Sequence, residues 1–140
     1  VSGLIIPDLP IQEYLKHYHE LFAKYQLTNI FLITPQTSDE RIRWIDQNSS
    51  SFIYAVSDAS ITGAKSGVSA AQQTYFKRLE SLSLTHPFLI GFGISDHESF
   101  STACQYAQGA IIGSAFIEVL REAGDLPSNI EKFIKSIKTG

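Results

Sequence analysis

The chain alternates short apolar runs with longer amphipathic segments, and this alternation restricts its fold more than any other feature. Runs rich in branched and aromatic residues recur at residues 3–6, 29–33, 52–56, 88–92 and 109–112. They are nearly continuous in apolar character, as is typical of strands that are buried on both faces of a parallel sheet. We therefore expect an α/β fold in which helices connect parallel strands.

The segments between the apolar runs carry helical periodicity. Near residues 10 and 11 the fixed φ and missing N–H of Pro10 suit a first helical turn, and the pattern places Leu15, Tyr18, Leu21 and Phe22 on the inward face of that helix. Residues 37–40 and 95–98 have the form of capping boxes that begin two further helices. The remaining helices are expected at residues 68–82, 114–123 and 128–138.

Five strand–helix units with one further helix are compatible with two architectures. One is an open doubly wound sheet, and the other is part of a closed (β/α)8 TIM barrel, three units short of eight. Periodicity does not choose between them. Because no linker or low-complexity tract interrupts the pattern, we expect residues 1–140 to belong to a single domain.

Composition narrows the possible partners. The hydrophobic content of 44% is enough for a buried core, and the formal net charge of −3 comes from interspersed acids and bases. No basic stripe is present to bind nucleic acid or a membrane surface, and no apolar stretch approaches the ~20 residues of a membrane span. The one cysteine, Cys104, excludes an intrachain disulfide and is expected to be a buried helix residue. These features fit the cytoplasm.

The histidines do not predict a metal site. His17 and His19 lie two positions apart on an expected helix, so they face nearly opposite directions and do not share an ion. The start of the chain is unusual: it begins with Val1, contains no Met, and reaches an apolar run two residues later. We interpret the chain as a piece of a longer protein.

Two glycine-containing turns give the clearest indication of a ligand. Gly91 and Gly93 follow the fourth apolar run, and Gly113 and Ser114 follow the fifth; each turn directly precedes an expected helix. Glycines allow backbone amides to approach a ligand, and helix N-termini attract anions. Such a pair after the last two strands is the recurrent phosphate site of (β/α)8 enzymes. The alternative is that these glycines only permit tight turns.

Two other segments could contribute to a site. The connection at residues 57–66 is longer than most connections of this kind and is expected to be a lid over the site, or else a solvated loop. Asp8, in the sequence Pro-Asp-Leu-Pro, follows the first apolar run, where a catalytic acid could lie. We favour the other interpretation, in which Asp8 caps the next helix or contacts a partner.

Five segments, in order and at matching spacing, resemble the second half of the tryptophan synthase alpha subunit. They are Ile-Ile-Pro-Asp-Leu-Pro (5–10), Phe-Leu-Ile-Thr-Pro-Gln-Thr-Ser-Asp-Glu-Arg-Ile (31–42), Phe-Ile-Tyr-Ala-Val-Ser (52–57) with Thr62 and Gly63, Gly-Phe-Gly-Ile-Ser (91–95) and Gly-Ser-Ala (113–115). The resemblance covers essentially the whole chain. It implies a partial TIM barrel with strands four to eight, that is, five C-terminal βα units and a closing helix.

The resemblance also implies an activity and a site. The substrate would be indole-3-glycerol phosphate, which a lyase step cleaves to indole and glyceraldehyde 3-phosphate. The implied substrate-binding residues are Gly63, Gly93, Gly113 and Ser114 at the phosphate, Tyr54 and Phe92 at the indole, and Thr62 in the lid. The family's two catalytic carboxylates belong to the N-terminal half, so no catalytic residue is expected among these residues, and the 140-residue piece is expected to be inactive.

The resemblance implies a partner as well. The loop containing Asp8 and Pro10 would face the tryptophan synthase beta subunit in an α2β2 assembly. Pyridoxal phosphate would belong to that beta subunit, and no cofactor is expected in this chain.

The lid sequence departs from the family pattern Ser-x-x-Gly-Val-Thr-Gly, because Ser60 replaces a glycine and Ile61 a valine. If that glycine has a positive φ, Ser60 costs on the order of 1 kcal/mol and alters lid closure. This leaves a second hypothesis, a regulatory subunit with weakened lyase activity that binds phosphate and activates the beta chain. A third is another phosphate-binding barrel such as indole-glycerol-phosphate synthase, which should not combine Pro-Asp-Leu-Pro with Tyr54, Thr62 and Gly63.

Overall fold

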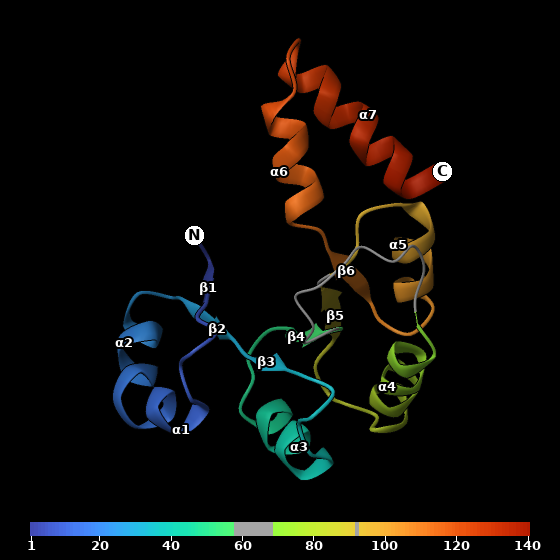
Figure 1. Ribbon diagram of the computed structural model, residues 1–140. Helices are drawn as coiled ribbons and strands as arrows, with labels where there is room; N and C mark the ends of the chain where they lie inside the picture. The colour runs from blue at the N-terminus through green and yellow to red at the C-terminus, as the bar shows by residue number, and fades with distance from the viewer. Residues whose placement is uncertain (58–68, 92) are drawn as a thin grey trace.

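A computed structural model describes residues 1–57, 69–91 and 93–140. Its strands are short, and helices separate them along the chain except between β2 and β3 (Figure 1). The strands are β1 (Gly3–Ile5), β2 (Thr28–Ile30), β3 (Leu32–Ile33), β4 (Ile53–Val56), β5 (Phe88–Gly91) and β6 (Gly109–Ile111). The helices are α1 (Ile11–Glu13), η1 (Tyr14–Tyr18), α2 (His19–Lys24), α3 (Asp39–Gln47), α4 (Ala70–Ser81), α5 (His97–Cys104), α6 (Ser114–Arg121) and α7 (Leu126–Thr139).

All strand pairs in the described residues are parallel, as the apolar runs predicted. β1 pairs with β2, and the second sheet has the order β3-β4-β5-β6. Only Phe31 separates β2 from β3, so the run at 29–33 forms one stretch of strand that pairs with β1 at its start and with β4 at its end. Every strand therefore neighbours the next one along the chain. A doubly wound sheet reverses its strand order at a switch point, whereas a barrel does not, so this order is that of a barrel.

The hydrophobic core lies between the strands and the helices that follow them around the outside (Figure 1). Ile53 and Ala55 of β4 and Ile90 of β5 are fully buried on this side. Alternate residues point to opposite faces of a strand, so Tyr54 belongs to the other, inner face. Its neighbours in register there are Leu32 of β3 and Leu89 of β5. A ligand bound at the carboxyl ends of the strands would therefore lie against this inner face.

The first helical segment begins at Ile11, as Pro10 predicted, but its inward face is partly different. Phe22 is buried, whereas Tyr18 is 42% exposed and Leu21 49% exposed, so the prediction was wrong for these two residues. The reason is that Tyr14–Tyr18 forms a π-helix, η1. The wider π turn shifts the helical phase that the α-helical period assumed.

Two helix caps and the cysteine also differ from the sequence predictions. The side chain that accepts from the first turn is Ser38 rather than Thr37 in α3, and Asp96 rather than Ser95 in α5. Both helices therefore start one residue later than the predicted boxes. Cys104 is exposed, because the inward position of α5 is taken by its neighbour Ala103, which is fully buried.

A buried carboxylate of α3 holds the turn that precedes β5. Asp46 is 6% exposed, and its carboxylate accepts hydrogen bonds from the backbone N–H groups of Thr85 and His86, both at 2.8 Å, and contacts the ring Nδ1 of His86 at 3.1 Å. Burial by itself raises the pKa of Asp46, but these donors outweigh it and hold the pKa of the carboxyl below its ordinary value. The contact joins α3 to the amino end of β5, away from the strand ends where a ligand would bind.

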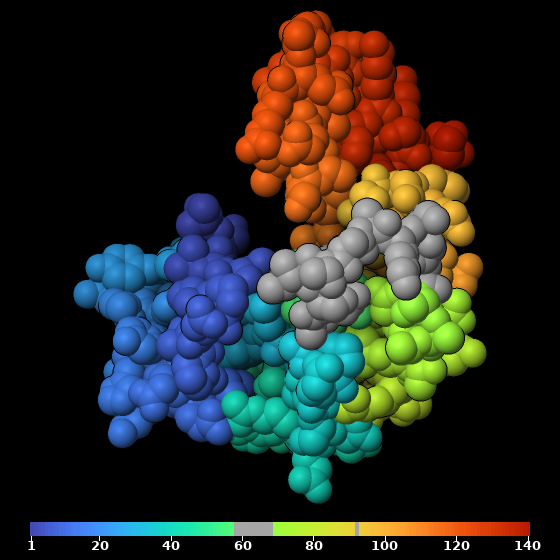
Figure 2. Space-filling model, in the orientation of Figure 1, coloured from blue at the N-terminus to red at the C-terminus, as the bar shows by residue number. Residues whose placement is uncertain are grey.

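The last two helices, α6 and α7, pack against each other, and the end of α7 lies against α5 (Figure 1). Figure 2 shows an open notch between the N-terminal strand and α6 on the face that it displays. The ring of His97 in α5 contacts the backbone carbonyl of Ile137 at 2.9 Å, which holds the end of α7 against α5. None of the helices in the described part of the chain has the length and apolar character that a membrane crossing requires.

Candidate functional site

The turn after β5 has a backbone that requires glycine. Gly93 has φ of +75°, a left-handed conformation that side chains other than glycine rarely adopt. Gly93 is exposed and lies just beyond the carboxyl end of β5. Gly93 is one of the residues for which the family resemblance implies contact with a phosphate.

The helix that follows this turn has an occupied N-terminus. The Asp96 carboxylate accepts from the Ser99 backbone N–H at 2.8 Å and from the Ser99 hydroxyl at 2.7 Å. These hydrogen bonds hold the pKa of Asp96 below its ordinary value. Because a carboxylate already satisfies the first turn of α5, an anion bound here would use the backbone near Gly93 rather than the end of the helix.

The N-terminus of α6 is different because no side chain caps it. Gly113 is the N-cap residue, it makes no side-chain hydrogen bond, and a Cβ added at Gly113 would meet nothing within 4 Å. Gly113 and Ser114 are both exposed. No side-chain hydrogen bond caps the first N–H groups of α6 at the positive end of the helix dipole, and this arrangement suits a phosphate.

Tyr54 lies on the inner face directly against Gly91. A Cβ built on Gly91 would come within 2.2 Å of ring atom Cε2 and 2.4 Å of the hydroxyl of Tyr54. The ring thus occupies the space that any other residue in place of Gly91 would need. Burial raises the pKa of the Tyr54 hydroxyl, so it is uncharged near neutral pH. Sequence analysis predicted Tyr54 as a site residue and placed Gly91 in the turn expected to bind phosphate, but it did not predict the contact between the two residues.

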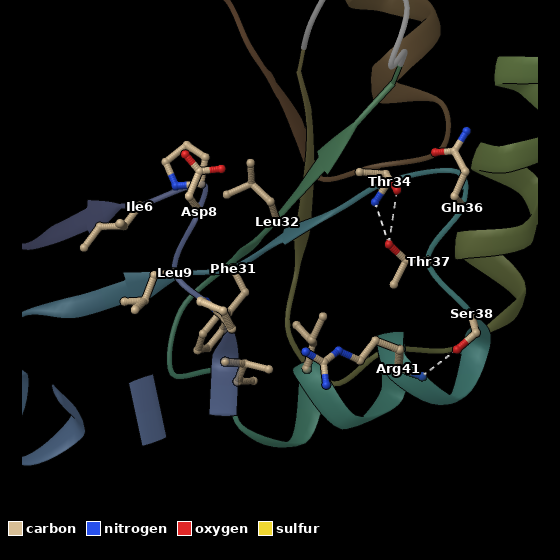
Figure 3. A pocket seen from close by; sticks show the side chains of 14 residues that line it. Ile6, Asp8, Leu9, Phe31, Leu32, Thr34, Gln36, Thr37, Ser38 and Arg41 are labelled. Carbon is tan, nitrogen blue, oxygen red and sulfur yellow. Dashed lines mark hydrogen bonds between the residues drawn. The ribbon is translucent and has the colours of Figure 1, made fainter. Parts of the chain in front are cut away.

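The loop with Asp8 and Pro10 borders a cavity of about 590 Å³. One wall is the segment at residues 6–11, and the opposite wall is the turn after β3 with Thr34, Gln36 and Thr37 (Figure 3). Asp8 is exposed, and α1 has no side-chain cap, so Asp8 does not cap this helix.

The turn after β3 is held by an arginine that sequence analysis missed. Arg78 of α4 donates from Nε to Asp39 Oδ1 at 2.7 Å and from Nη1 to the carbonyl of Pro35 at 2.9 Å, and its Nη2 donates to the carbonyl of Thr37. The partners lie 39 to 43 residues away in the sequence, and no local pattern relates such distant positions.

The remaining predicted site residues, Thr62, Gly63 and Phe92, lie outside the described residues, as do Ser60 and Ile61 of the unusual lid sequence. Tyr54 lies within β4, Gly93 follows the carboxyl end of the adjacent strand β5, and Gly113 and Ser114 follow the carboxyl end of β6, the next strand. Within residues 1–57, 69–91 and 93–140, no group of three or more His, Cys, Asp and Glu side chains is placed to bind a metal ion.

The parallel strands in sequential order define the class: part of a (β/α)8 barrel. The family model for the tryptophan synthase alpha chain matches residues 1–139. The chain therefore belongs to the tryptophan synthase alpha chain family.

Relatives and solved structures agree with this assignment. The tryptophan synthase alpha chain of Flavobacterium johnsoniae is 54% identical over 99% of this chain and 54% of its own length, and that of Flavobacterium psychrophilum is 56% identical over 98% and 53%. A Pyrococcus furiosus structure described as the tryptophan synthase a2b2 complex, in a study of its mutual activation, matches with a TM-score of 0.81 and 27% identity over 98% of this chain and 55% of that chain. The chain spans about half the length of the curated relatives it matches.

Proposed function

We propose that these residues are the phosphate-binding and partner-facing part of a tryptophan synthase alpha subunit. As a full-length chain, this subunit cleaves indole-3-glycerol phosphate to indole and glyceraldehyde 3-phosphate in tryptophan biosynthesis. The observation that carries the proposal is the uncapped N-terminus of α6 at Gly113 and Ser114, beside the Gly93 turn, in a chain of this family. Free helix N–H groups at this place favour a phosphorylated substrate.

The indole end of the substrate is assigned to the inner face. Tyr54 provides a large, partly buried ring there, held against Gly91, and the row of Leu32 and Leu89 beside it is apolar. Aromatic and aliphatic surfaces of this kind suit a flat apolar ring. Phe92, Thr62 and Gly63 complete the proposed substrate site.

The partner is proposed to be a tryptophan synthase beta subunit that contacts the loop with Asp8 and Pro10. This loop is exposed and forms one wall of the 590 Å³ cavity. An α2β2 complex of the family is described for the Pyrococcus furiosus protein. Pyridoxal phosphate is assigned to the beta subunit and no cofactor to this chain.

The phosphate assignment is tested by Gly113→Asp in a full-length alpha chain that carries these residues. Aspartate is a good N-cap, so the variant should be as stable as the parent or more stable by a few tenths of a kcal/mol. Its charge would occupy the N–H groups and repel a phosphate, so affinity for indole-3-glycerol phosphate should fall by about tenfold or more.

Gly113→Asn is the matched control, since it caps the helix without a charge and should lose less affinity. Isothermal titration measures the affinity, and thermal unfolding measures the stability. Unchanged affinity in Gly113→Asp would contradict the phosphate assignment.

A further inference from the structure

We propose that Arg78 is a positioning residue for the surface that binds the partner, which is formed by the two walls of the 590 Å³ cavity. It acts through the turn at residues 34–37, which forms one of these walls. The inference rests on the proposed function, which places Asp8 and Pro10 at the interface with a beta subunit. Arg78 lies on α4, outside both walls of the cavity. Its effect on a partner would therefore be indirect.

The guanidinium reaches the turn from the side of α4. Nε and Nη1 donate to Asp39 Oδ1 at 2.7 Å and to the Pro35 carbonyl at 2.9 Å, and Nη2 donates to the carbonyl of Thr37. The arginine side chain is only 31% exposed. A planar guanidinium presents several donors in a fixed geometry, whereas a lysine ammonium does not match three acceptors arranged in this way.

The turn itself is internally rigid. The backbone N–H of Thr34 donates to Thr37 Oγ1 at 2.9 Å, and the backbone N–H of Thr37 donates to the carbonyl of Thr34 at 3.0 Å. These bonds fix the shape of the turn but do not attach it to α4. Arg78 makes that attachment, so it sets where the turn lies as a unit.

The position of the turn matters because it forms the wall of the cavity opposite the Asp8 loop. Thr34, Gln36 and Thr37 line that wall (Figure 3). The helices that follow the two walls, α1 and α3, are also linked, because the Arg41 guanidinium of α3 donates to the Gln12 amide oxygen of α1 at 3.0 Å. A shift of the turn would change the distance between the two walls, and with it the surface that a partner contacts.

The test uses a full-length alpha chain with these residues and a beta chain, at a temperature well below all unfolding midpoints. The variants are Arg78→Gln and Arg78→Lys. The matched control is Arg121→Gln, because Arg121 donates to Glu118 of its own helix, at 2.8 Å, and both side chains are about two-thirds exposed or more. Hydrogen exchange of the amides at residues 34–38 reports on the turn, and titration gives the Kd for the beta chain.

Arg78→Gln should accelerate exchange in the turn by about tenfold and raise the Kd by about tenfold, with Arg78→Lys between it and the parent and Arg121→Gln unchanged. A merely structural role would lower the unfolding midpoint without changing the Kd of the folded chain. Unchanged exchange in Arg78→Gln, or faster exchange with the parent Kd, overturns the proposal. If the parent binds no beta chain, the proposed partner is wrong and the interface role of Arg78 falls with it, while the exchange data still decide whether Arg78 holds the turn.

Discussion

At the scale of single residues, the contact between Gly91 and Tyr54 determines part of the shape of the proposed site. The two residues lie on adjacent strands, with Tyr54 in register with Leu89 and Gly91 two residues further along β5. Because residues two apart share a face, the ring can lie across Gly91 only where no side chain is present. Glycine here sets the position of an aromatic side chain in the proposed indole site.

Gly91→Ala should therefore disturb both stability and binding. The new Cβ would meet three atoms of the Tyr54 ring at 2.2 to 2.6 Å. Such overpacking costs about 1–3 kcal/mol, and it should raise the KM for indole-3-glycerol phosphate by displacing the ring. Steady-state kinetics and thermal unfolding of the full-length chain measure the two effects.

Gly109→Ala on the next strand is the control for Gly91→Ala. A Cβ at Gly109 would meet only the flexible end of Leu89, at 3.3 Å, so a smaller effect is expected. Equal effects of the two substitutions would show that the Tyr54 contact has no special role.

Single residues differ in how well their sequence context predicts them. The turn glycine Gly93 was predictable, because a glycine between a strand and a helix commonly supplies the positive φ observed there. The caps were shifted by one residue, because Thr37 and Ser38, like Ser95 and Asp96, are all chemically able to cap. Arg78 was not predictable, since its acceptors are brought together only by the tertiary fold.

At the scale of elements, the link between α3 and the start of β5 depends on a buried carboxylate. Asp46 accepts two backbone N–H bonds at 2.8 Å from residues 85 and 86. Its pKa is lowered in the folded state, so the contact stabilises the fold above the unfolded-state pKa of about 4 and the stabilisation is lost as the pH falls through the folded-state value.

Asp46→Asn should destabilise the full-length chain by about 1–3 kcal/mol near pH 7, because an amide cannot accept all of these hydrogen bonds. The difference in unfolding free energy between parent and variant should shrink as the pH falls from about 4, the unfolded-state pKa, through the lower pKa of the folded parent. Denaturant unfolding at several pH values measures this difference. A difference that stays constant from pH 7 to pH 3 would contradict the assigned role.

The parallel strands were predictable as elements because their apolar runs are nearly continuous. The exposure of Tyr18 and Leu21 was not, because nothing in the local pattern indicates the π-helix of Tyr14–Tyr18. The division of the apolar run at 29–33 into β2 and β3 was not predictable either. It arises because β2 pairs with β1 and β3 pairs with β4.

At the scale of the whole molecule, the described strands leave a free edge on β1 and another on β6. Apolar side chains are exposed near both: Ile5 of β1 is 43% exposed, and Ile117 and Leu120 of α6 are 49% and 44% exposed. The elements that carry these residues, β1 and α6, flank the notch seen in Figure 2. A closed eight-stranded barrel would cover such edges.

The 140-residue chain alone should therefore self-associate. Sedimentation velocity should show assemblies that grow with concentration, because free strand edges and apolar side chains promote association. Ile117→Lys should reduce this association, whereas Glu118→Lys, on the same helix and already exposed, should not. A monomer with a sharp and reversible unfolding transition would contradict the prediction.

The choice between a barrel and a doubly wound sheet could not be made from periodicity. Both architectures repeat the same strand–helix unit, and they differ in strand order, which long-range pairing determines. The resemblance of residues 5–10, 91–95 and 113–115 to a known family indicated the barrel. The sequential pairing of the strands in the structure confirms it.

The central claim, that these residues belong to a working alpha subunit, is tested most directly by indole release from indole-3-glycerol phosphate. The measurement uses a full-length chain that carries these residues, with and without the beta chain. We predict turnover that rises when the beta chain is present. No indole under either condition would contradict the claim, and stimulated beta-chain activity in the same experiment would identify a regulatory subunit instead.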